Sequence, residues 1–334
     1  MTEYSDFIDR TLRPNVTESE TVIDLFAGCG GLSLGFEAAG YKTMGFEMQA
    51  WAAETYSVNM GGRCSNVKLK VGQDLPHADV VIGGPPCQPF SVRGKQGGSK
   101  DDRDGFPIFI NAIDRLSPRL FLFENVRNLM FSHKWYLNQI LAELRGLGYI
   151  IEVQRLNAVN YNIPQNMERI VVVGHKSSFT YPAESSSRVS VREAIGDTMT
   201  TFCESSRFLT AAQDEHIAKY EKASHCVNPR DLHPDKPART LTCRNLAGAT
   251  SDMQRVRLPD GRRRRISVNE AARLQSFPDW FKFMGNEQQQ FTQIGNAVPP
   301  LLALQLANAV KATLKQKDLE PDEIKRTNAT YKPL

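Results

Sequence analysis

Short apolar runs alternate with amphipathic stretches along the first half of the chain. Five such runs predict buried strands, at residues 21–26, 41–47, 78–84, 119–126 and 169–174. Four stretches with apolar residues at helical spacing lie between them, at residues 32–40, 50–60, 106–116 and 135–148. Strands that alternate with helices predict an α/β fold, doubly wound around a mostly parallel sheet.

The pattern changes near residue 180. From there to about residue 290 the chain is rich in Ser, Thr, Arg and Pro without clear periodicity, and an amphipathic helix is then predicted over 297–314. We therefore expect a large domain over 1–176, a small irregular domain over 177–288, and a segment over 289–334 that returns to the large domain. The last residues, 320–334, are expected to form a loosely held tail.

Composition narrows the class of protein. The 334 residues are 41% hydrophobic and 23% charged, no uninterrupted apolar run approaches membrane-spanning length, and the N-terminus lacks the apolar stretch of a secretory signal. We expect a cytoplasmic protein with no membrane partner. The 6 cysteines and 6 histidines show no CxxC or HExxH spacing, so we expect free thiols and no metal site.

Basic residues are concentrated late in the chain. The net charge is only +4, yet RVRLPDGRRRRIS (255–267) carries six arginines against one aspartate. On charge alone, a segment that binds nucleic acid and a solvated hairpin tip around the Asp260-Gly261 turn are about equally good interpretations.

A glycine-rich turn follows the first predicted strand. Gly28, Gly30 and Gly31 allow the backbone to turn tightly and approach a ligand at the start of a helix. Their spacing is not the GxGxxG of dinucleotide sites, and Glu47, at the end of the second strand, could hold both hydroxyls of a ribose. An adenosine cofactor without phosphates fits better than NAD, and a turn with only a structural role is the alternative.

A cysteine and an acid follow two other strands. Cys87, in VVIGGPPCQPFS (80–91), lies at the sheet edge where open parallel sheets bind ligands, so a nucleophile there would face the cofactor. The alternative is a buried cysteine that packs as a small apolar residue. The flanking prolines and glycines favour the nucleophile, since they fix backbone direction. Glu124 and Asn125 interrupt an apolar strand at the same edge, as a salt-bridged strand end or a proton-handling acid would.

Six segments, in order along nearly the whole chain, are similar to the motifs of the DNA (cytosine-5)-methyltransferases of the bacterial restriction-modification type. They are DLFAGCGGLSLGF (24–36), GGPPCQPFS (83–91), ENV (124–126), NYNIPQNMERIVVVG (160–174), RRISVNEAARLQSFPDWF (264–281) and QIGNAVPPLLA (293–303). The resemblance implies the Rossmann-like, doubly wound fold of methyltransferases that depend on S-adenosylmethionine, with a smaller, irregular target-recognition domain. Met167 departs from the family, because it stands where an arginine is usual.

The resemblance also implies the roles of individual residues. Cys87 would add to carbon 6 of a flipped-out cytosine, Glu124 would act at N3, and Arg169 would hold O2. The cofactor would be S-adenosylmethionine, converted to S-adenosylhomocysteine. The residues expected to bind it are Phe26, Gly28, Cys29, Gly30, Gly31, Glu47, Met48, Asp74, Leu75, Pro86, Asn296 and Val298.

The implied partner is double-stranded DNA, read by a target-recognition region at about 177–262. The loop 91–105 would close over the flipped base, and the arginines at 262–265 would face DNA. Thr240, in a segment similar to the family's Thr-Leu landmark, is expected to orient a phosphate. The residues expected to bind DNA are Gln88, Ser91, Arg93, Lys95, Arg239, Thr240, Arg244, Arg255 and Arg257.

The enzyme is expected to protect host DNA beside a cognate restriction endonuclease encoded nearby, as a monomer in the bacterial cytoplasm at the nucleoid. A tRNA methyltransferase of the same fold is the nearest alternative, but the segment after residue 176 lacks the Cys-Phe-Thr element of that group. An inactive DNA-binding homologue is the alternative from another class, and Cys87, Glu124 and Arg169 are all present. The glycine-rich turn does not support an unrelated thiol enzyme such as a dehydrogenase.

Overall fold

The computed structural model describes residues 1–86, 104–204, 206–223, 231–248 and 252–330. The chain divides into two compact units, each built from three segments. Unit 1 comprises Met1–Arg13, Ala158–Met167 and Glu184–Leu302, and unit 2 comprises Pro14–Asn157, Glu168–Ala183 and Ala303–Leu334. These limits differ from the sequence prediction, which assigned residues 1–13 and 158–167 to the large domain and placed the later boundaries at 176 and 288.

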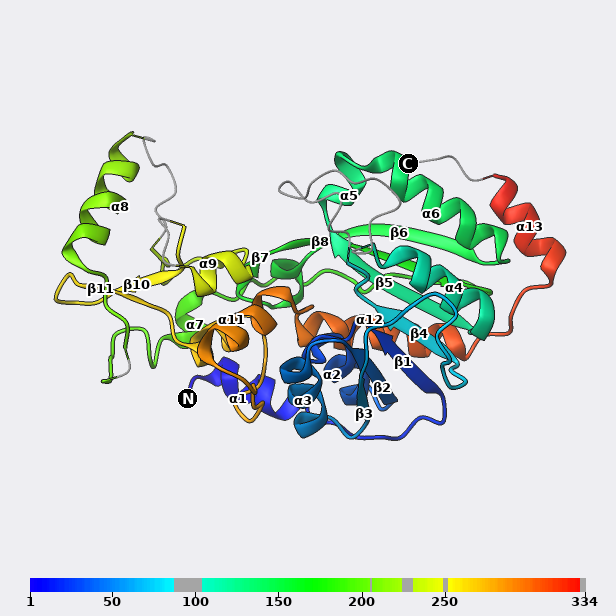
Figure 1. Cartoon of the computed structure of the whole chain (residues 1–334), viewed down its shortest axis with the longest axis horizontal. Coiled ribbons are helices and arrows are strands. Elements are labelled where there is room, and N and C mark those ends of the chain that lie inside the picture. Colours follow the sequence, from blue (N-terminus) through cyan, green and yellow to red (C-terminus); the bar gives the residue numbers. More distant parts are fainter. Residues whose placement is uncertain (87–103, 205, 224–230, 249–251, 331–334) are drawn as a thin grey trace. The chain divides into compact units, whose positions relative to one another are not determined.

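Unit 2 contains a seven-stranded sheet in the order β3-β2-β1-β4-β5-β8-β6 (Figure 1). The strands are β1 (Thr21–Leu25), β2 (Lys42–Glu47), β3 (Arg63–Asn66), β4 (Val80–Gly83), β5 (Leu120–Val126), β6 (Ile150–Asn157) and β8 (Glu168–His175). The first five are parallel, whereas β8 runs antiparallel to both of its neighbours, β5 and β6. The predicted doubly wound α/β fold is confirmed, with a mixed sheet.

Helices cover both faces of this sheet. On one face, α4 (Phe106–Leu116) and α6 (Lys134–Gly146) bury an apolar core against alternate residues of β1, β4 and β5. Alternation along β1 and β2 turns Asp24 and Gly45 to the opposite face, where α2 (Gly31–Ala38) and α3 (Ala50–Asn59) pack. Because Gly45 has no side chain, the ring of Tyr56 from α3 can lie directly on the strand.

Four elements of unit 2 differ from the sequence prediction. Strands β3 and β6 were not predicted: β3 is mostly exposed, and polar residues interrupt β6. The expected tail contains a helix, α13 (Pro321–Ala329), which buries Ile324, and its Asn328 side chain donates a hydrogen bond to the Tyr149 carbonyl at 2.9 Å. The prediction of a loosely held tail is therefore wrong for these residues. A four-residue helix, α5 (Asn128–Phe131), follows β5.

Unit 1 is built from short elements. Its helices are α1 (Glu3–Thr11), α7 (Val191–Ile195), α8 (Ala211–Ala223), α9 (Cys243–Ala247), α10 (Val268–Leu274) and α11 (Glu287–Asn296), with a 3₁₀ turn at Ala158–Tyr161. Its strands form two pairs, parallel β7 (Gln165–Asn166) with β9 (Ala238–Arg239) and antiparallel β10 (Arg255–Arg257) with β11 (Arg263–Arg265). The second pair confirms the hairpin that was predicted around Asp260-Gly261.

Helix α11 is followed by α12 (Pro300–Leu314). By length and composition alone, the span Glu287–Leu314 is long and apolar enough to cross a membrane, which the sequence analysis did not anticipate. However, 67% of the most apolar 18-residue stretch of this span is buried inside the protein, as in a core helix. From Ala303 onward α12 packs on α2, where a β-carbon at Gly35 would lie 2.3 Å from the Leu304 amide nitrogen. Only glycine permits this close contact.

Candidate active site

An acid and an arginine meet where β5 ends in unit 2. Because β8 is antiparallel to β5, its first residues lie beside the last residues of β5, and Arg169 pairs in register with Val126. The Nε of Arg169 lies 2.6 Å from Oε1 of Glu124, and the two side chains are only 13% and 12% exposed. Burial raises the pKa of Glu124, and the nearby guanidinium opposes that rise without cancelling it. The sequence prediction named both residues, and the structure places them in contact.

The neighbouring residue Asn125 joins β5 to the segment that leads to Cys87. Its side-chain nitrogen donates a hydrogen bond to the Pro85 carbonyl at 2.9 Å, and its side-chain oxygen accepts one from the Val126 amide. A β-carbon on Gly84 would lie 3.9 Å from Oε2 of Glu124, so the end of β4 passes next to the acid. Five predicted residues lie outside the described part of the chain: Cys87, Gln88, Ser91, Arg93 and Lys95.

The glycine-rich turn between β1 and α2 has the backbone of a ligand-binding loop. Gly28 and Gly30 have φ values of +55° and +89°, and Phe26 also adopts a left-handed conformation, with φ +60°. A β-carbon on Gly30 would lie 2.8 Å from the Tyr56 ring, whereas a β-carbon on Gly28 would meet nothing within 4 Å. The open space at Gly28 lies against the turn, as expected of a cradle for a ligand.

Glu47 connects this turn to the end of β2. One carboxylate oxygen accepts a hydrogen bond from the Gly28 amide at 3.0 Å, and the other accepts one from the Gln49 amide at 2.7 Å. Each carboxylate oxygen can accept a second hydrogen bond, so Glu47 fixes the turn and can still receive two ribose hydroxyls. A buried acid beside an open glycine turn fits an adenosine cofactor that has no phosphate.

A buried hydrogen-bonded chain supports the turn from below. The Tyr56 hydroxyl donates to Ser33 at 3.0 Å, and the Ser33 hydroxyl donates to Asp24 at 2.7 Å. Burial raises the pKa of Asp24 to about 7, although the hydrogen bond from Ser33 opposes this rise. Burial likewise raises the pKa of Cys29 to about 12, so this buried thiol stays protonated, and its contact with the cofactor stays a prediction.

The other residues predicted to bind the cofactor differ in exposure and in the unit to which they belong. Met48 and Asp74 are exposed in unit 2, while Leu75 and Pro86 are half-buried there. Asn296 and Val298 belong to unit 1, so a contact between them and the cofactor stays a prediction.

Near the turn, Asn66 was missed by sequence reasoning, and Gly105 was expected only as part of the closing loop 91–105. The Asn66 side chain donates hydrogen bonds to the carbonyls of Glu47 and Met48, at 2.9 and 3.0 Å, which fixes the backbone after β2. Gly105 lies so close to Phe26 and Pro86 that a β-carbon there would be 3.0 and 2.5 Å from them. No local pattern marks Asn66 in the sequence, because β3 is short and polar.

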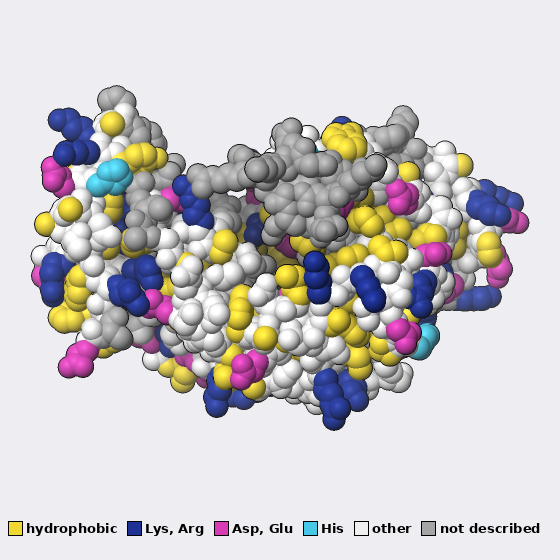
Figure 2. All heavy atoms as spheres, in the orientation of Figure 1, with side chains coloured by type: hydrophobic (Ala, Val, Ile, Leu, Met, Phe, Trp, Pro, Cys, Tyr) yellow, Lys and Arg dark blue, Asp and Glu magenta, His cyan; other side chains and the backbone are white. Residues whose placement is uncertain are grey.

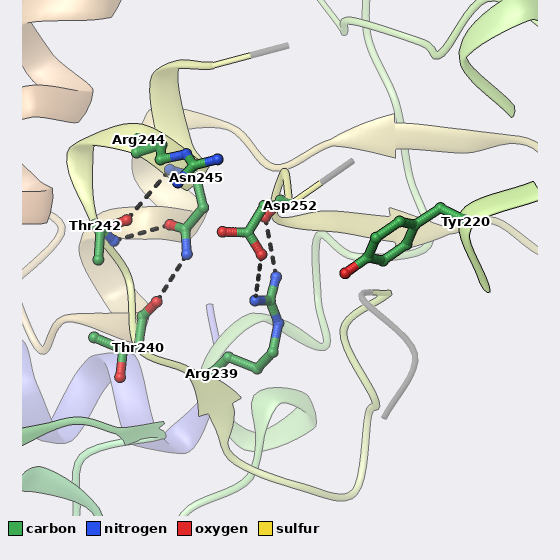
Figure 3. Close-up of a pocket in the computed structure, with 7 residues that line it drawn as sticks. All are labelled: Tyr220, Arg239, Thr240, Thr242, Arg244, Asn245 and Asp252. Carbon is green, nitrogen blue, oxygen red and sulfur yellow. Dashed lines mark hydrogen bonds and ion pairs between the residues drawn. The ribbon is translucent and has the colours of Figure 1, made fainter. Parts of the chain in front are cut away.

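Unit 1 contains a pocket of about 600 Å³ near the predicted target-recognition residues (Figure 3). It is lined by Tyr220, Arg239, Thr240, Thr242, Arg244, Asn245 and Asp252. The Thr240 hydroxyl donates to the Asn166 carbonyl at 2.7 Å, and Arg244 is exposed. Thr242 caps α9, and its amide nitrogen donates to the Asn245 side chain. The predicted residues Arg239, Thr240 and Arg244 therefore line one cavity.

The arginines of the β10–β11 hairpin do not have the role that their charge suggested. Arg255 is fully buried, with its guanidinium paired to Asp231 and Glu221. A side chain held in this way cannot contact a DNA groove, so the prediction that Arg255 binds DNA is wrong. Arg257, in contrast, is exposed on the same strand, and its contact with DNA stays a prediction.

The four consecutive arginines at 262–265 are also paired within unit 1. Arg263 contacts Asp214 at 2.9 Å, Arg264 contacts the buried Glu270 at 2.8 Å, and Arg265 contacts Glu287 at 3.0 Å; Arg262 lies 2.7 Å from Asp260. The pairs of Arg263, Arg264 and Arg265 fasten the hairpin to acids elsewhere in unit 1, whereas Arg262 is 52% exposed and pairs with Asp260 within the hairpin. Three of the four arginines therefore do not form the expected DNA-facing cluster, and contact of Arg262 with DNA stays a prediction. On the face shown in Figure 2, basic side chains are scattered among acidic ones.

Met167, where the resemblance expects an arginine, is buried in unit 1. Its carbonyl accepts a hydrogen bond from the Ala158 amide at 2.9 Å. This position therefore supplies a core contact and no charge.

Comparison with known proteins gives the same assignment as the motifs. The family model for C-5 cytosine-specific DNA methylases matches residues 21–312. The chain is similar to Type II methyltransferase M.AplI of Arthrospira platensis, with 51% identity over 96% of this chain and 94% of the relative. It is also similar to Type II methyltransferase M1.HphI of Haemophilus parahaemolyticus, with 33% identity over 87% of each chain.

Solved structures share the fold. A protein described as a DNA modification methyltransferase encoded within an Escherichia coli prophage has a TM-score of 0.66 and 25% identity, covering 89% of this chain and 100% of its own. The Entamoeba histolytica methyltransferase EhMeth has a TM-score of 0.69 and 18% identity, covering 90% of this chain and 100% of its own. The match of the family model over most of the chain confirms the predicted family and activity. The chain belongs to the C-5 cytosine-specific DNA methylases and is a DNA (cytosine-5) methyltransferase.

Proposed function

We propose that the protein transfers a methyl group from S-adenosylmethionine to carbon 5 of a flipped-out cytosine, through a covalent bond between Cys87 and carbon 6. The observation that carries this proposal is the contact between Glu124 and Arg169 at the sheet edge, next to the segment that leads to Cys87. The cofactor residues proposed are the 28–31 turn and Glu47. S-adenosylmethionine supplies an electrophilic methyl group when bound.

The chemistry requires an acid, a cation and a nucleophile. Carbon 5 of cytosine is a poor nucleophile, and addition of the Cys87 thiolate to carbon 6 activates it. That addition builds negative charge on the ring, which Glu124 offsets by hydrogen bonding at N3 when it is protonated. Its raised pKa favours that form. Arg169 holds Glu124 in place and presents its guanidinium to O2. Once carbon 5 has received the methyl group, transfer of its proton to water as the base would expel the thiolate, which restores the enzyme.

The cytosine lies within a specific sequence of double-stranded DNA, which unit 1 reads. Its pocket at Arg239, Thr240 and Arg244 supports this assignment, since the target-recognition residues proposed from the sequence line it together. The similar proteins M.AplI and M1.HphI carry the name Type II methyltransferase. We therefore assign the enzyme to a restriction-modification system, where it protects cytoplasmic DNA from an endonuclease encoded nearby and acts as a monomer.

Trapping on modified DNA tests the covalent step. Duplex DNA with 5-fluorocytosine at the target should become covalently attached to the wild-type enzyme, because fluorine cannot leave as the proton does. The target itself is found first by bisulfite sequencing of a plasmid that carries the active gene. Cys87→Ala should abolish both trapping and methyl transfer while it retains S-adenosylmethionine binding, measured by calorimetry.

Cys203→Ala is the matched control, since Cys203 is an exposed cysteine of unit 1. This variant should trap DNA as the wild type does. Methyl transfer by Cys87→Ala at a near-normal rate would exclude the covalent mechanism.

A further inference from the structure

Arg239 and Asp252 form a pair in the wall of the unit 1 pocket (Figure 3). Nη1 of Arg239 lies 3.0 Å from Oδ1 of Asp252, and Nη2 donates to the Asp252 carbonyl at 3.1 Å. One residue thus fixes both terminal nitrogens of the guanidinium. The Arg239 backbone is fixed as well, because β9 pairs with β7 and the Gln254 side chain donates to the Arg239 carbonyl at 3.3 Å.

The pair remains accessible at the pocket. The side chains of Arg239 and Asp252 are 29% and 32% exposed, whereas Arg255 and Arg264 of the same unit are paired to acids with almost no exposure. Phosphates would repel an acid exposed in a DNA-binding pocket unless a hydrogen-bond donor of the DNA meets it. The exposed carboxylate of Asp252 therefore needs a role in DNA binding, whereas the neighbouring arginines are simply attracted by the phosphates.

The major-groove edge of a G·C base pair supplies such a donor in the right order. Guanine presents two acceptors, N7 and O6, and the adjacent cytosine presents the N4 amino donor. A guanidinium beside a carboxylate presents donors followed by an acceptor, which complements that edge. An A·T pair shows an acceptor, a donor and an acceptor, so its central amino group would face a guanidinium donor.

We propose that Arg239 and Asp252 act together to read one G·C base pair of the target sequence, with Arg239 on guanine and Asp252 on the cytosine N4 amino group. This inference rests on the proposed function of unit 1 as the part that reads DNA. Fixing the guanidinium before DNA arrives lowers the entropy lost on binding, since a long side chain need not be immobilised in the complex. Asp252 is thus both a positioning residue for Arg239 and a specificity residue.

Methylation of a random-sequence DNA library tests the proposal. Arg239→Ala and Asp252→Ala should each relax the same single position of the methylated sequence, by about 10-fold or more in preference for G·C. The double variant should be no more relaxed than either single variant, because the two residues read one base pair. The matched controls are Arg192→Ala and Asp235→Ala, which break an exposed ion pair of unit 1 at 2.8 Å outside this pocket and should leave the sequence preference unchanged.

Base analogues separate the two contacts. In wild-type enzyme, 7-deazaguanine, which lacks N7, and 2-pyrimidinone, which lacks the N4 amino group, should each weaken binding at that base pair. The 7-deazaguanine effect should vanish in Arg239→Ala, and the 2-pyrimidinone effect should vanish in Asp252→Ala.

A purely structural pair predicts different results. Arg239→Ala and Asp252→Ala would then lower methylation of all sequences alike and leave the preferred sequence unchanged. That result, in either variant, overturns the proposal. Calorimetric binding of S-adenosylmethionine shows whether each variant is folded, and Asp252→Asn provides a milder second variant that should also relax the position. Absence of methylation by the wild type would instead contradict the proposed function.

Discussion

Replacing Arg169 should destabilise the protein in a manner that depends on pH. Arg169→Met removes the cation from a pair whose members are 13% and 12% exposed, and leaves the Glu124 carboxylate buried without a partner. Breaking a buried ion pair from one side costs about 3–5 kcal/mol of unfolding free energy. We expect a loss of this size at pH 8, measured by urea denaturation.

The dependence on pH follows from the direction of the shift. The pKa of Glu124 is already raised in the folded protein, and loss of Arg169 raises it further. An acid whose pKa is higher in the folded than in the unfolded state destabilises the fold once pH rises above the unfolded value. The loss caused by Arg169→Met should therefore be small near pH 4, grow by up to about 1.4 kcal/mol per pH unit, and level off above the new folded pKa.

The control replaces the Glu124 carboxylate by the uncharged amide of glutamine. Glu124→Gln removes the charge that Arg169 compensates, so the double variant Glu124→Gln, Arg169→Met should be more stable at pH 8 than Arg169→Met alone. Equal losses for Arg169→Met at pH 5 and pH 8 would refute the electrostatic reasoning. Additive losses in the double variant would show that packing of the arginine, and not compensation of Glu124, accounts for the effect.

Three further variants test the remaining contacts. Glu47→Ala should weaken S-adenosylmethionine binding by about 1.5–3 kcal/mol in calorimetry, because its charge-assisted hydrogen bonds are lost, and unchanged affinity would place the ribose elsewhere. Gly105→Ala should lower the methylation rate at least about 10-fold, because its β-carbon would displace the segment that leads to Cys87, whereas Gly146→Ala, whose β-carbon meets nothing within 4 Å, should not. Arg255→Met should cost about 3–5 kcal/mol of stability in urea denaturation, whereas Arg257→Ala, on the exposed side of the same strand, should cost almost none.

The site on the sheet was predictable because strand ends are visible in the sequence. Glu124 interrupts an apolar strand, and the glycine-rich turn follows another. The apolar pattern of the strands and the glycines after the first strand therefore place both features at one edge of the sheet. The contact between Glu124 and Arg169 was not derivable in the same way. It depends on β8 running antiparallel, which the length of the connection and the apolar pattern do not specify.

The basic hairpin shows the opposite case, where local charge was misleading. Three of the acids that pair with its arginines, Asp214, Glu221 and Asp231, lie 24 or more residues earlier in the chain, in α8 and after it. A local count of charges cannot include such partners. The division of the chain was missed for a similar reason, since residues 1–13 and 158–167 join unit 1 through contacts with distant segments.

The position of β8 in the sheet also determines when the sheet can be completed during synthesis of the chain. β8 is the last of the seven strands to leave the ribosome, yet it pairs between β5 and β6. Until it emerges, β5 and β6 each have an open edge, which favours aggregation of chains that stop early. The strand that closes this gap begins with Glu168 and Arg169, so a nascent chain completes its sheet and brings Arg169 to Glu124 in a single event.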